Sequence, residues 1–183
     1  MTEKQGRNSD QVTVIPYGPD EGAEFIGSDG NDYIHGTNFD DTIEAADGTD
    51  LVEGVGGDDY IEGGDGNDII YGGTGHDSIA DAGGDNFLVG GEGDDSIDVG
   101  EFGNSDLYGG KGDDYLNAFF GATGQLYGNS GDDYLSVDGG VNSVFGHSGN
   151  DIIEAFNGTN TLDGGSGDDM ITGGNGVDSI WGG

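Results

Sequence analysis

Aspartate recurs at one fixed phase along most of this chain, and carboxylates at regular spacing are the ligands of hard cations. In the best-preserved segments the aspartate is the sixth residue of the pattern G-G-x-G-x-D-x-U-x, where U is aliphatic. GGDGNDIIY from Gly63 and GGSGDDMIT from Gly164 are two examples. Ca²⁺ takes six to eight oxygen ligands in flexible geometry. The pattern therefore indicates cation binding, provided that the fold brings successive carboxylates together.

The aspartates belong to a nine-residue unit that occurs seventeen times between Gly27 and Trp181, with one-residue insertions in the units that begin at Val99 and Ala118. A fixed short period predicts a solenoid, because one unit cannot bury its apolar side alone and stacking supplies the core. The U position is aliphatic in every unit and is expected to form that core: Ile34, Ile43, Val52, Ile61, Ile70, Ile79, Leu88, Ile97, Leu107, Leu116, Leu126, Leu135, Val144, Ile153, Leu162, Ile171 and Ile180.

Two units are expected to make one flattened coil of about 18 residues, in which six turn residues precede a three-residue strand x-U-x. Alternate units then share an edge. We call the turns of the units that begin at 36, 54, 72, 90, 109, 128, 146 and 164 the even edge, and the turns of the units that begin at 27, 45, 63, 81, 99, 118, 137, 155 and 173 the odd edge. The even edge carries aspartate at every sixth position: Asp41, Asp59, Asp77, Asp95, Asp114, Asp133, Asp151 and Asp169.

The odd edge is less regular. It carries Asp32, Asp50 and Asp68, then Asn86, Ser105, Gly124, Asn142 and Asn160, and finally Asp178. The even edge is therefore predicted to bind cations along its whole length, and the odd edge only near the N-terminus.

Successive aspartates of one edge should lie one coil apart, near the ~4.8 Å spacing of neighbouring strands. Two carboxylates about 5 Å apart, at an effective dielectric constant of about 20, repel by roughly 3 kcal/mol. Such a column requires either protonation or a cation between neighbours. Calcium fits better than magnesium, which prefers a tight octahedron and keeps its water.

Glycine turns can approach a ligand closely and adopt positive φ. Their carbonyl oxygens are expected to complete the coordination, and the candidates are Gly64, Gly66, Gly73, Gly75, Gly91, Gly93, Gly110, Gly112, Gly131, Gly149, Gly165 and Gly167.

Over about 85% of its length the chain closely resembles the RTX family, the hemolysin-type calcium-binding nonapeptide repeat. The resemblance implies an all-β fold, a right-handed parallel β-roll (β-solenoid) of about eight to nine coils with Ca²⁺ in the turns. It also implies folding on extracellular calcium and type I secretion from a Gram-negative bacterium.

One ion per adjacent pair of aspartates, as the resemblance implies, gives seven Ca²⁺ on the even edge and two on the odd edge. These nine ions would change the formal net charge from −35 to about −17. Phe39, which replaces a turn glycine, weakens the first even-edge site.

Composition excludes several functions. The formal net charge of −35 disfavours nucleic acid and anionic membranes as partners. The chain has no cysteine and no apolar run long enough to span a membrane, and its first residues lack the apolar region of a secretory signal peptide. Residues 1–24 are expected to form a leader with a capping strand at 12–15. Residues 25–183 are expected to form the roll, and a first short strand is expected at 24–26. Because no carboxylate pair stands out from the repeat, no catalysis is expected.

An aromatic row is expected on the outside of the strands that follow the odd edge: Tyr71, Val89, Tyr108, Tyr127 and Phe145, with Trp181 further on. Phe102, Phe119, Phe120 and Phe156 gather in the turns of that edge. These residues either replace calcium by packing or form a contact surface for protein or neutral glycan.

Three functions follow from the sequence. The first is a calcium-dependent folding and stability module of a secreted or cell-surface protein, joined to other domains of a longer chain. The second is a ligand-binding or adhesin module, and the third is a self-associating surface-layer spacer. Polyanionic glycan and ice are disfavoured as ligands, because the repeats contain only Lys111 as a basic residue and their threonines are scattered.

Overall fold

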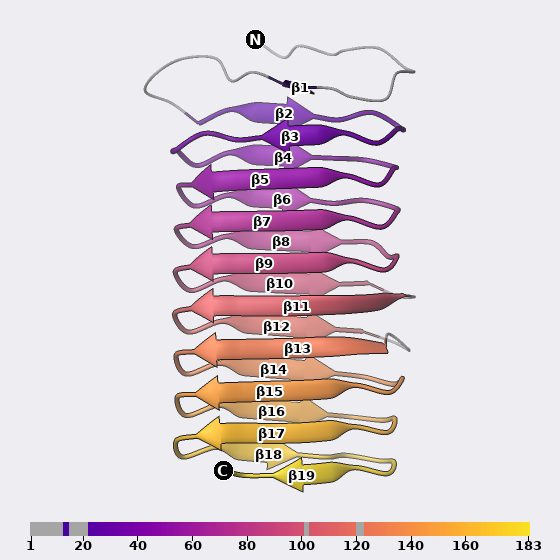
Figure 1. Cartoon of the computed structure of the whole chain (residues 1–183), viewed down its shortest axis with the longest axis vertical. Helices are drawn as coiled ribbons and strands as arrows, with labels where there is room; N and C mark the ends of the chain where they lie inside the picture. The colour runs from indigo at the N-terminus through magenta and orange to yellow at the C-terminus, as the bar shows by residue number, and fades with distance from the viewer. Residues whose placement is uncertain (1–12, 15–21, 101–102, 120–122) are drawn as a thin grey trace.

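The computed structural model describes residues 13–14, 22–100, 103–119 and 123–183. In these residues the chain forms a parallel β-solenoid without helices, in which strands alternate between two facing sheets (Figure 1). The prediction of an all-β solenoid with coils of about 18 residues is confirmed, because from β2 to β19 paired residues are 18 apart, or 19 across the two insertions, and only β1 and β3 pair at 20.

The odd sheet consists of the odd-numbered strands, each parallel to the next: β1 (Thr13–Val14), β3 (Tyr33–His35), β5 (Leu51–Gly56), β7 (Ile69–Thr74), β9 (Phe87–Glu92), β11 (Asn104–Lys111), β13 (Thr123–Ser130), β15 (Ser143–Ser148), β17 (Thr161–Ser166) and β19 (Ser179–Trp181). The even sheet consists of β2 (Glu24–Ile26), β4 (Thr42–Glu44), β6 (Tyr60–Glu62), β8 (Ser78–Asp81), β10 (Ser96–Val99), β12 (Tyr115–Ala118), β14 (Tyr134–Val137), β16 (Ile152–Ala155) and β18 (Met170–Thr172).

The predicted three-residue strand matches four of the nine described strands of the even sheet, whereas the other five have four residues, and it is too short for most of the odd sheet. Strands β5 to β17 of the odd sheet have six or eight residues, because they continue into the opening residues of the even-edge turn. Val55, Gly73 and Gly91, the second residues of three such turns, pair in register from coil to coil. The even edge is therefore held by backbone pairing on one side of each turn.

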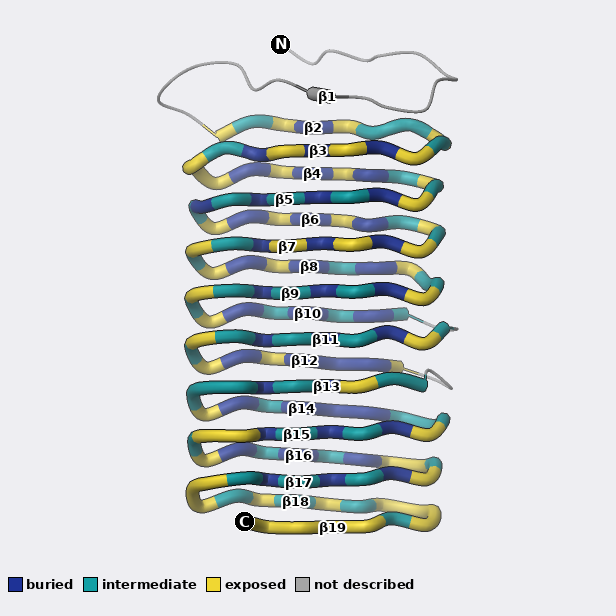
Figure 2. Tube along the Cα trace, viewed as in Figure 1, coloured by how far each residue is buried: buried dark blue, intermediate teal, exposed yellow. Residues whose placement is uncertain are grey.

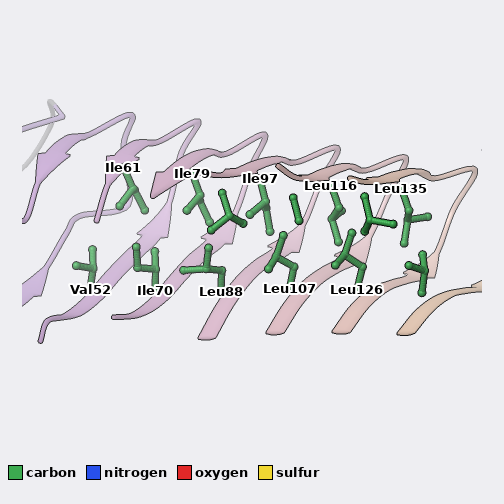
Figure 3. Packing of buried hydrophobic residues seen from close by; sticks show 14 of the residues in the cluster. Val52, Ile61, Ile70, Ile79, Leu88, Ile97, Leu107, Leu116, Leu126 and Leu135 are labelled. Carbon is green, nitrogen blue, oxygen red and sulfur yellow. The ribbon is translucent and has the colours of Figure 1, made fainter. Parts of the chain in front are cut away.

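The core is a double row of aliphatic side chains from the strands of both sheets, which face each other (Figure 3). The U side chains from Ile34 to Leu162 are buried, while the flanking residues alternate outward (Figure 2). Two members of the predicted core depart from this rule. Ile171 is only partly buried and Ile180 is 49% exposed, because no described coil packs beyond β18 and β19.

The N-terminal strands lie where the sequence places them. Strand β1 falls within the expected capping segment and pairs with β3, and β2 pairs with β4 and buries Phe25 completely. The division into a leader of residues 1–24 and a roll of residues 25–183 stays a prediction.

The expected aromatic row is present on the odd sheet. Tyr71, Val89, Tyr108, Tyr127 and Phe145 are in register on successive strands. The Tyr108 and Tyr127 rings stack with centroids 4.6 Å apart and planes 9° apart, and Tyr127 stacks on Phe145 at 5.2 Å and 10°. These ring faces cover one another. Of the four turn phenylalanines, Phe119 and Phe156 are 42% and 50% exposed, whereas Phe102 and Phe120 lie outside the described residues.

Candidate metal centre

The eight sixth-position aspartates of the even edge form one continuous ladder. In each link the backbone N–H of one aspartate donates a hydrogen bond to Oδ1 of the aspartate in the next coil, at 2.8 to 2.9 Å. Seven such bonds connect Asp41 to Asp169. The predicted column of stacked carboxylates is therefore present in the structure.

The second carboxylate oxygen of these aspartates has no partner. Oδ2 is buried and accepts no hydrogen bond in Asp59, Asp77, Asp95, Asp114, Asp133, Asp151 and Asp169. On the odd edge the same is true of Asp50 and Asp68. A buried carboxylate oxygen without a donor is costly, and a bound cation would satisfy it. These oxygens fit the hard-oxygen donor set of calcium.

Burial raises the pKa of Asp50, Asp59, Asp95, Asp114 and Asp133, and the charges of neighbouring carboxylates raise it further. The pKa rises to about 6 in Asp50, to about 7 in Asp59, Asp95 and Asp133, and to about 8 in Asp114. The N–H donated from the preceding coil acts in the opposite direction. Without a cation, the column would therefore hold protons near neutral pH.

Every predicted turn glycine, from Gly64 to Gly167, has a positive φ, between 95° and 151°. This backbone region favours glycine. Among the residues that the structure describes, four others share it without being glycine: Ala46 (φ 79°), Val55 (φ 88°), Asn129 (φ 78°) and His147 (φ 77°). Each is the second residue of its unit, where the repeat pattern asks for glycine.

The first glycine of each even-edge unit has a role that the sequence reasoning missed. A Cβ at Gly36, Gly54 or Gly146 would lie 2.7, 2.3 or 2.1 Å from Oδ2 of the aspartate in the same turn. The other five even-edge units show the same conflict, at 2.2 to 2.4 Å. The first position is therefore glycine because the buried carboxylate occupies the space. The signal in the sequence is the joint occurrence of glycine at position one and aspartate at position six.

In four of the five odd-edge units that lack a sixth-position aspartate, the first position is apolar. Val99, Ala118, Val137 and Ala155 are buried, in units whose sixth residues are Ser105, Gly124, Asn142 and Asn160. Aliphatic groups thus take the space that a carboxylate would need. The remaining polar side chains bond among themselves, as Asn142 Nδ2 donates to Asn160 Oδ1 and Asn160 Nδ2 donates to Asp178 Oδ1.

The first aspartate of each edge differs from the others. Oδ2 of Asp32 accepts hydrogen bonds from the backbone N–H and the hydroxyl of Ser28, and Oδ2 of Asp41 accepts the backbone N–H of Thr37. Ser28 and Thr37 are the second residues of their units, where glycine is the rule. The terminal carboxylates are therefore satisfied by the chain itself.

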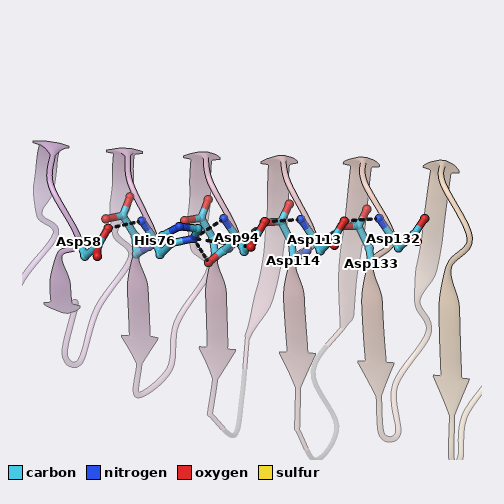
Figure 4. A network of polar contacts seen from close by, with 9 residues as sticks. Asp58, His76, Asp94, Asp113, Asp114, Asp132 and Asp133 are labelled. Carbon is cyan, nitrogen blue, oxygen red and sulfur yellow. Dashed lines mark hydrogen bonds and ion pairs between the residues drawn. The ribbon is translucent and has the colours of Figure 1, made fainter.

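A second ladder, exposed to solvent, runs along the even edge one residue before the aspartate column (Figure 4). Its members are Asp40, Asp58, His76, Asp94, Asp113, Asp132, Asn150 and Asp168. Each side chain from Asp40 to Asn150 accepts the backbone N–H of the corresponding residue in the next coil, so the bonds run opposite to those of the buried ladder. The sequence contained the signal, because the fifth residue of every even-edge unit can accept a hydrogen bond.

Within the described parts of the chain, no group of three or more histidine, cysteine, aspartate or glutamate side chains converges on one point. The stacked aspartates could hold a cation between two carboxylates of neighbouring coils. The described residues also include no helix that could cross a membrane.

The model of the RTX calcium-binding nonapeptide repeat matches the chain in overlapping segments: residues 26–61, 45–79, 73–104, 81–116, 99–122, 125–153 and 154–183. The matches cover most of the chain, which therefore belongs to the RTX calcium-binding repeat family. The fold is thus a structural calcium-binding β-roll rather than the scaffold of an enzyme family, and such repeats are typical of secreted bacterial proteins. No curated protein matches the chain.

Proposed function

We propose that this chain is a calcium-dependent folding and stabilising module of a secreted protein, with ions bound between successive turns. The observation that carries the proposal is the set of nine sixth-position aspartates whose buried Oδ2 has no partner. Seven of them lie on the even edge and two on the odd edge. This agrees with one ion per adjacent aspartate pair, and with carbonyl oxygens of the positive-φ glycines completing each site.

Energetics support a role in folding. The formal net charge of −35 opposes compaction, and the buried carboxylates lack donors. A ligand that binds only the folded form stabilises it by RT ln(1 + [L]/Kd), which is about 2.7 kcal/mol at 100 times Kd. Several such sites together can decide whether the roll folds. Extracellular calcium-binding modules have Kd values of about 10⁻⁴ to 10⁻³ M, so we place the folded module outside the cell.

The aromatic row supports packing more than ligand binding. Tyr108, Tyr127 and Phe145 stack face to face along the odd sheet. A glycan that stacks on aromatic rings needs free ring faces, and these faces are covered. We assign the row to the stability of the coils that lack odd-edge aspartates.

Calcium titration followed by far-ultraviolet circular dichroism tests the proposal. The protein in chelator at pH 8 is expected to lack β-structure and to gain it cooperatively as calcium approaches the millimolar range. Magnesium at equal concentration is the control and should not replace calcium. A spectrum that does not respond to calcium would contradict the proposed function.

A further inference from the structure

The first position of the odd-edge units points into the interior of the roll. Ala45, Val99, Ala118, Val137 and Ala155 occupy it and are buried. Asp81 occupies the same position, in register with Val99 on the neighbouring strand, and is only 5% exposed. A carboxylate thus stands in a column that otherwise holds aliphatic groups or glycine.

Asp81 stands in the first unit that lacks the sixth-position aspartate. The residue at that sixth position is Asn86, whose Oδ1 accepts the N–H of Asp68 at 2.8 Å, as an aspartate Oδ1 does elsewhere. Its Nδ2 donates a hydrogen bond to Asp81 Oδ1 at 2.5 Å, and the N–H of Gly83 donates to the same oxygen at 3.0 Å. Asn86 therefore continues the hydrogen-bond ladder of the odd edge and holds the carboxylate of Asp81 in place.

The remaining oxygen of Asp81 faces the carboxylate of the preceding turn. Asp81 Oδ2 and Asp68 Oδ2 lie 2.3 and 3.2 Å from the place that a Cβ on Gly63 would take, so the two oxygens are within about 5.5 Å of each other. Both are buried and neither accepts a hydrogen bond. Among the described residues Asp81 Oδ2 is the only such oxygen that does not belong to a sixth-position aspartate.

We propose that Asp68 and Asp81 hold a divalent cation of the calcium type, forming a third odd-edge site outside the nonapeptide pattern. The site rests on the proposed calcium-binding function and extends it by one coil. Asp81 supplies the charged oxygen that the amide of Asn86 cannot supply. The donors are carboxylate oxygens, with Gly84 in the same turn at a φ of 125°, as in the regular turns. This donor set favours calcium over metals that prefer nitrogen or sulfur.

Asp68 and Asp81 are both buried, and their Oδ2 atoms lie close to the same point beside Gly63. The folded chain thus disfavours two bare charges at this point, and a proton or a cation must compensate them. Ion counting separates these two cases.

The experiment is native mass spectrometry of the folded chain in calcium, comparing the wild type with Asp81→Asn. The variant is expected to hold one calcium ion fewer. Asp65→Asn is the matched control, because Asp65 is an exposed carboxylate in the same turn as Asp68, and it should keep the full number of ions. A variant with Asp81→Gly and Asn86→Asp restores the regular pattern and should recover the lost ion.

Equal ion counts in the wild type and Asp81→Asn would overturn the third site and leave the proposed function standing. If Asp81→Asn does not fold, the restored pattern decides: a count above that of the wild type would also overturn the inference, because it would mean that the wild type holds no ion at this point. Absence of calcium from all the proteins would overturn the proposed function and the third site together.

Discussion

Asp114→Asn should have opposite effects on stability in calcium and in chelator. Asp114 lies in the middle of the even-edge ladder, accepts the N–H of Asp95 through Oδ1, and donates its own N–H to Asp133. An asparagine keeps both hydrogen bonds, since its Oδ1 can accept and its backbone is unchanged. What the variant loses is one negative charge and the unpartnered Oδ2.

In calcium, the loss affects two proposed sites, one shared with Asp95 and one with Asp133. At a free calcium concentration 100 times Kd, each site contributes about 2.7 kcal/mol to the free energy of unfolding. The variant is therefore expected to lose about 5 kcal/mol. In chelator, above pH 8, it removes two repulsions of about 3 kcal/mol each between carboxylates about 5 Å apart at an effective dielectric constant of about 20. The calcium-free fold should then become more stable.

Urea unfolding in calcium and osmolyte-induced folding in chelator, both followed by circular dichroism, measure the two effects. Asp163→Asn on strand β17 makes the same charge change outside the turns and should have a small effect of one sign in both conditions. A loss of stability of equal size in calcium and in chelator would refute the reasoning, because it would mean that Asp114 acts through packing alone.

Four further predictions follow from the structure. In chelator the pKa values of the buried aspartates, raised to about 6 to 8, mean that the fold takes up protons. The stability of the calcium-free fold should be greatest below the unfolded-state pKa of about 3.9 and should fall as the pH rises to about 8. Circular dichroism against pH measures this, and a stability that rises with pH would contradict the prediction. Val55→Gly should raise the free energy of unfolding by about 1 kcal/mol, because a β-branched residue is strained at a φ of 88°; a lower urea midpoint would argue against that strain. Leu116→Ala should lower the free energy of unfolding by about 2 to 5 kcal/mol. Ile180→Ala should lower it by under about 1 kcal/mol, because Ile180 is 49% exposed. Similar losses in the two variants would show that the end coil is covered. Tyr108→Ser with Tyr127→Ser should lower stability by about 1 kcal/mol or more without changing light scattering in calcium; reduced association instead would identify the aromatic row as a contact surface.

The repeat made most of the fold predictable. Each coil contacts its neighbours at the same register, so the position of Ile61 or Leu135 in the core follows from counting residues. Sorting units by parity also placed the aspartate ladder on one edge. This works because a solenoid reduces packing to one dimension.

Other features depend on side-chain direction at positions that the repeat leaves free. In the sequence, Asp81 is a first position at which glycine is replaced. Only the structure shows that its side chain lies inside the roll beside Asp68. The first-position glycines were overlooked for a similar reason, since the space they leave belongs to a carboxylate five residues later. The exposure of Ile180 follows from the packing at one end of the roll, which a periodic pattern cannot express.

The pairing between coils has a mechanical consequence. In the described residues each strand pairs with the strands of the neighbouring coils, and the coils stack along the long axis of the roll (Figure 1), so the inter-strand hydrogen bonds lie along that axis. A force that pulls the two ends apart would load one interface at a time and peel off single coils. Each coil of 18 residues would release about 60 Å of extended chain. With ions bridging neighbouring turns, the roll would act as a stepwise extensible tether whose resistance depends on the calcium around it.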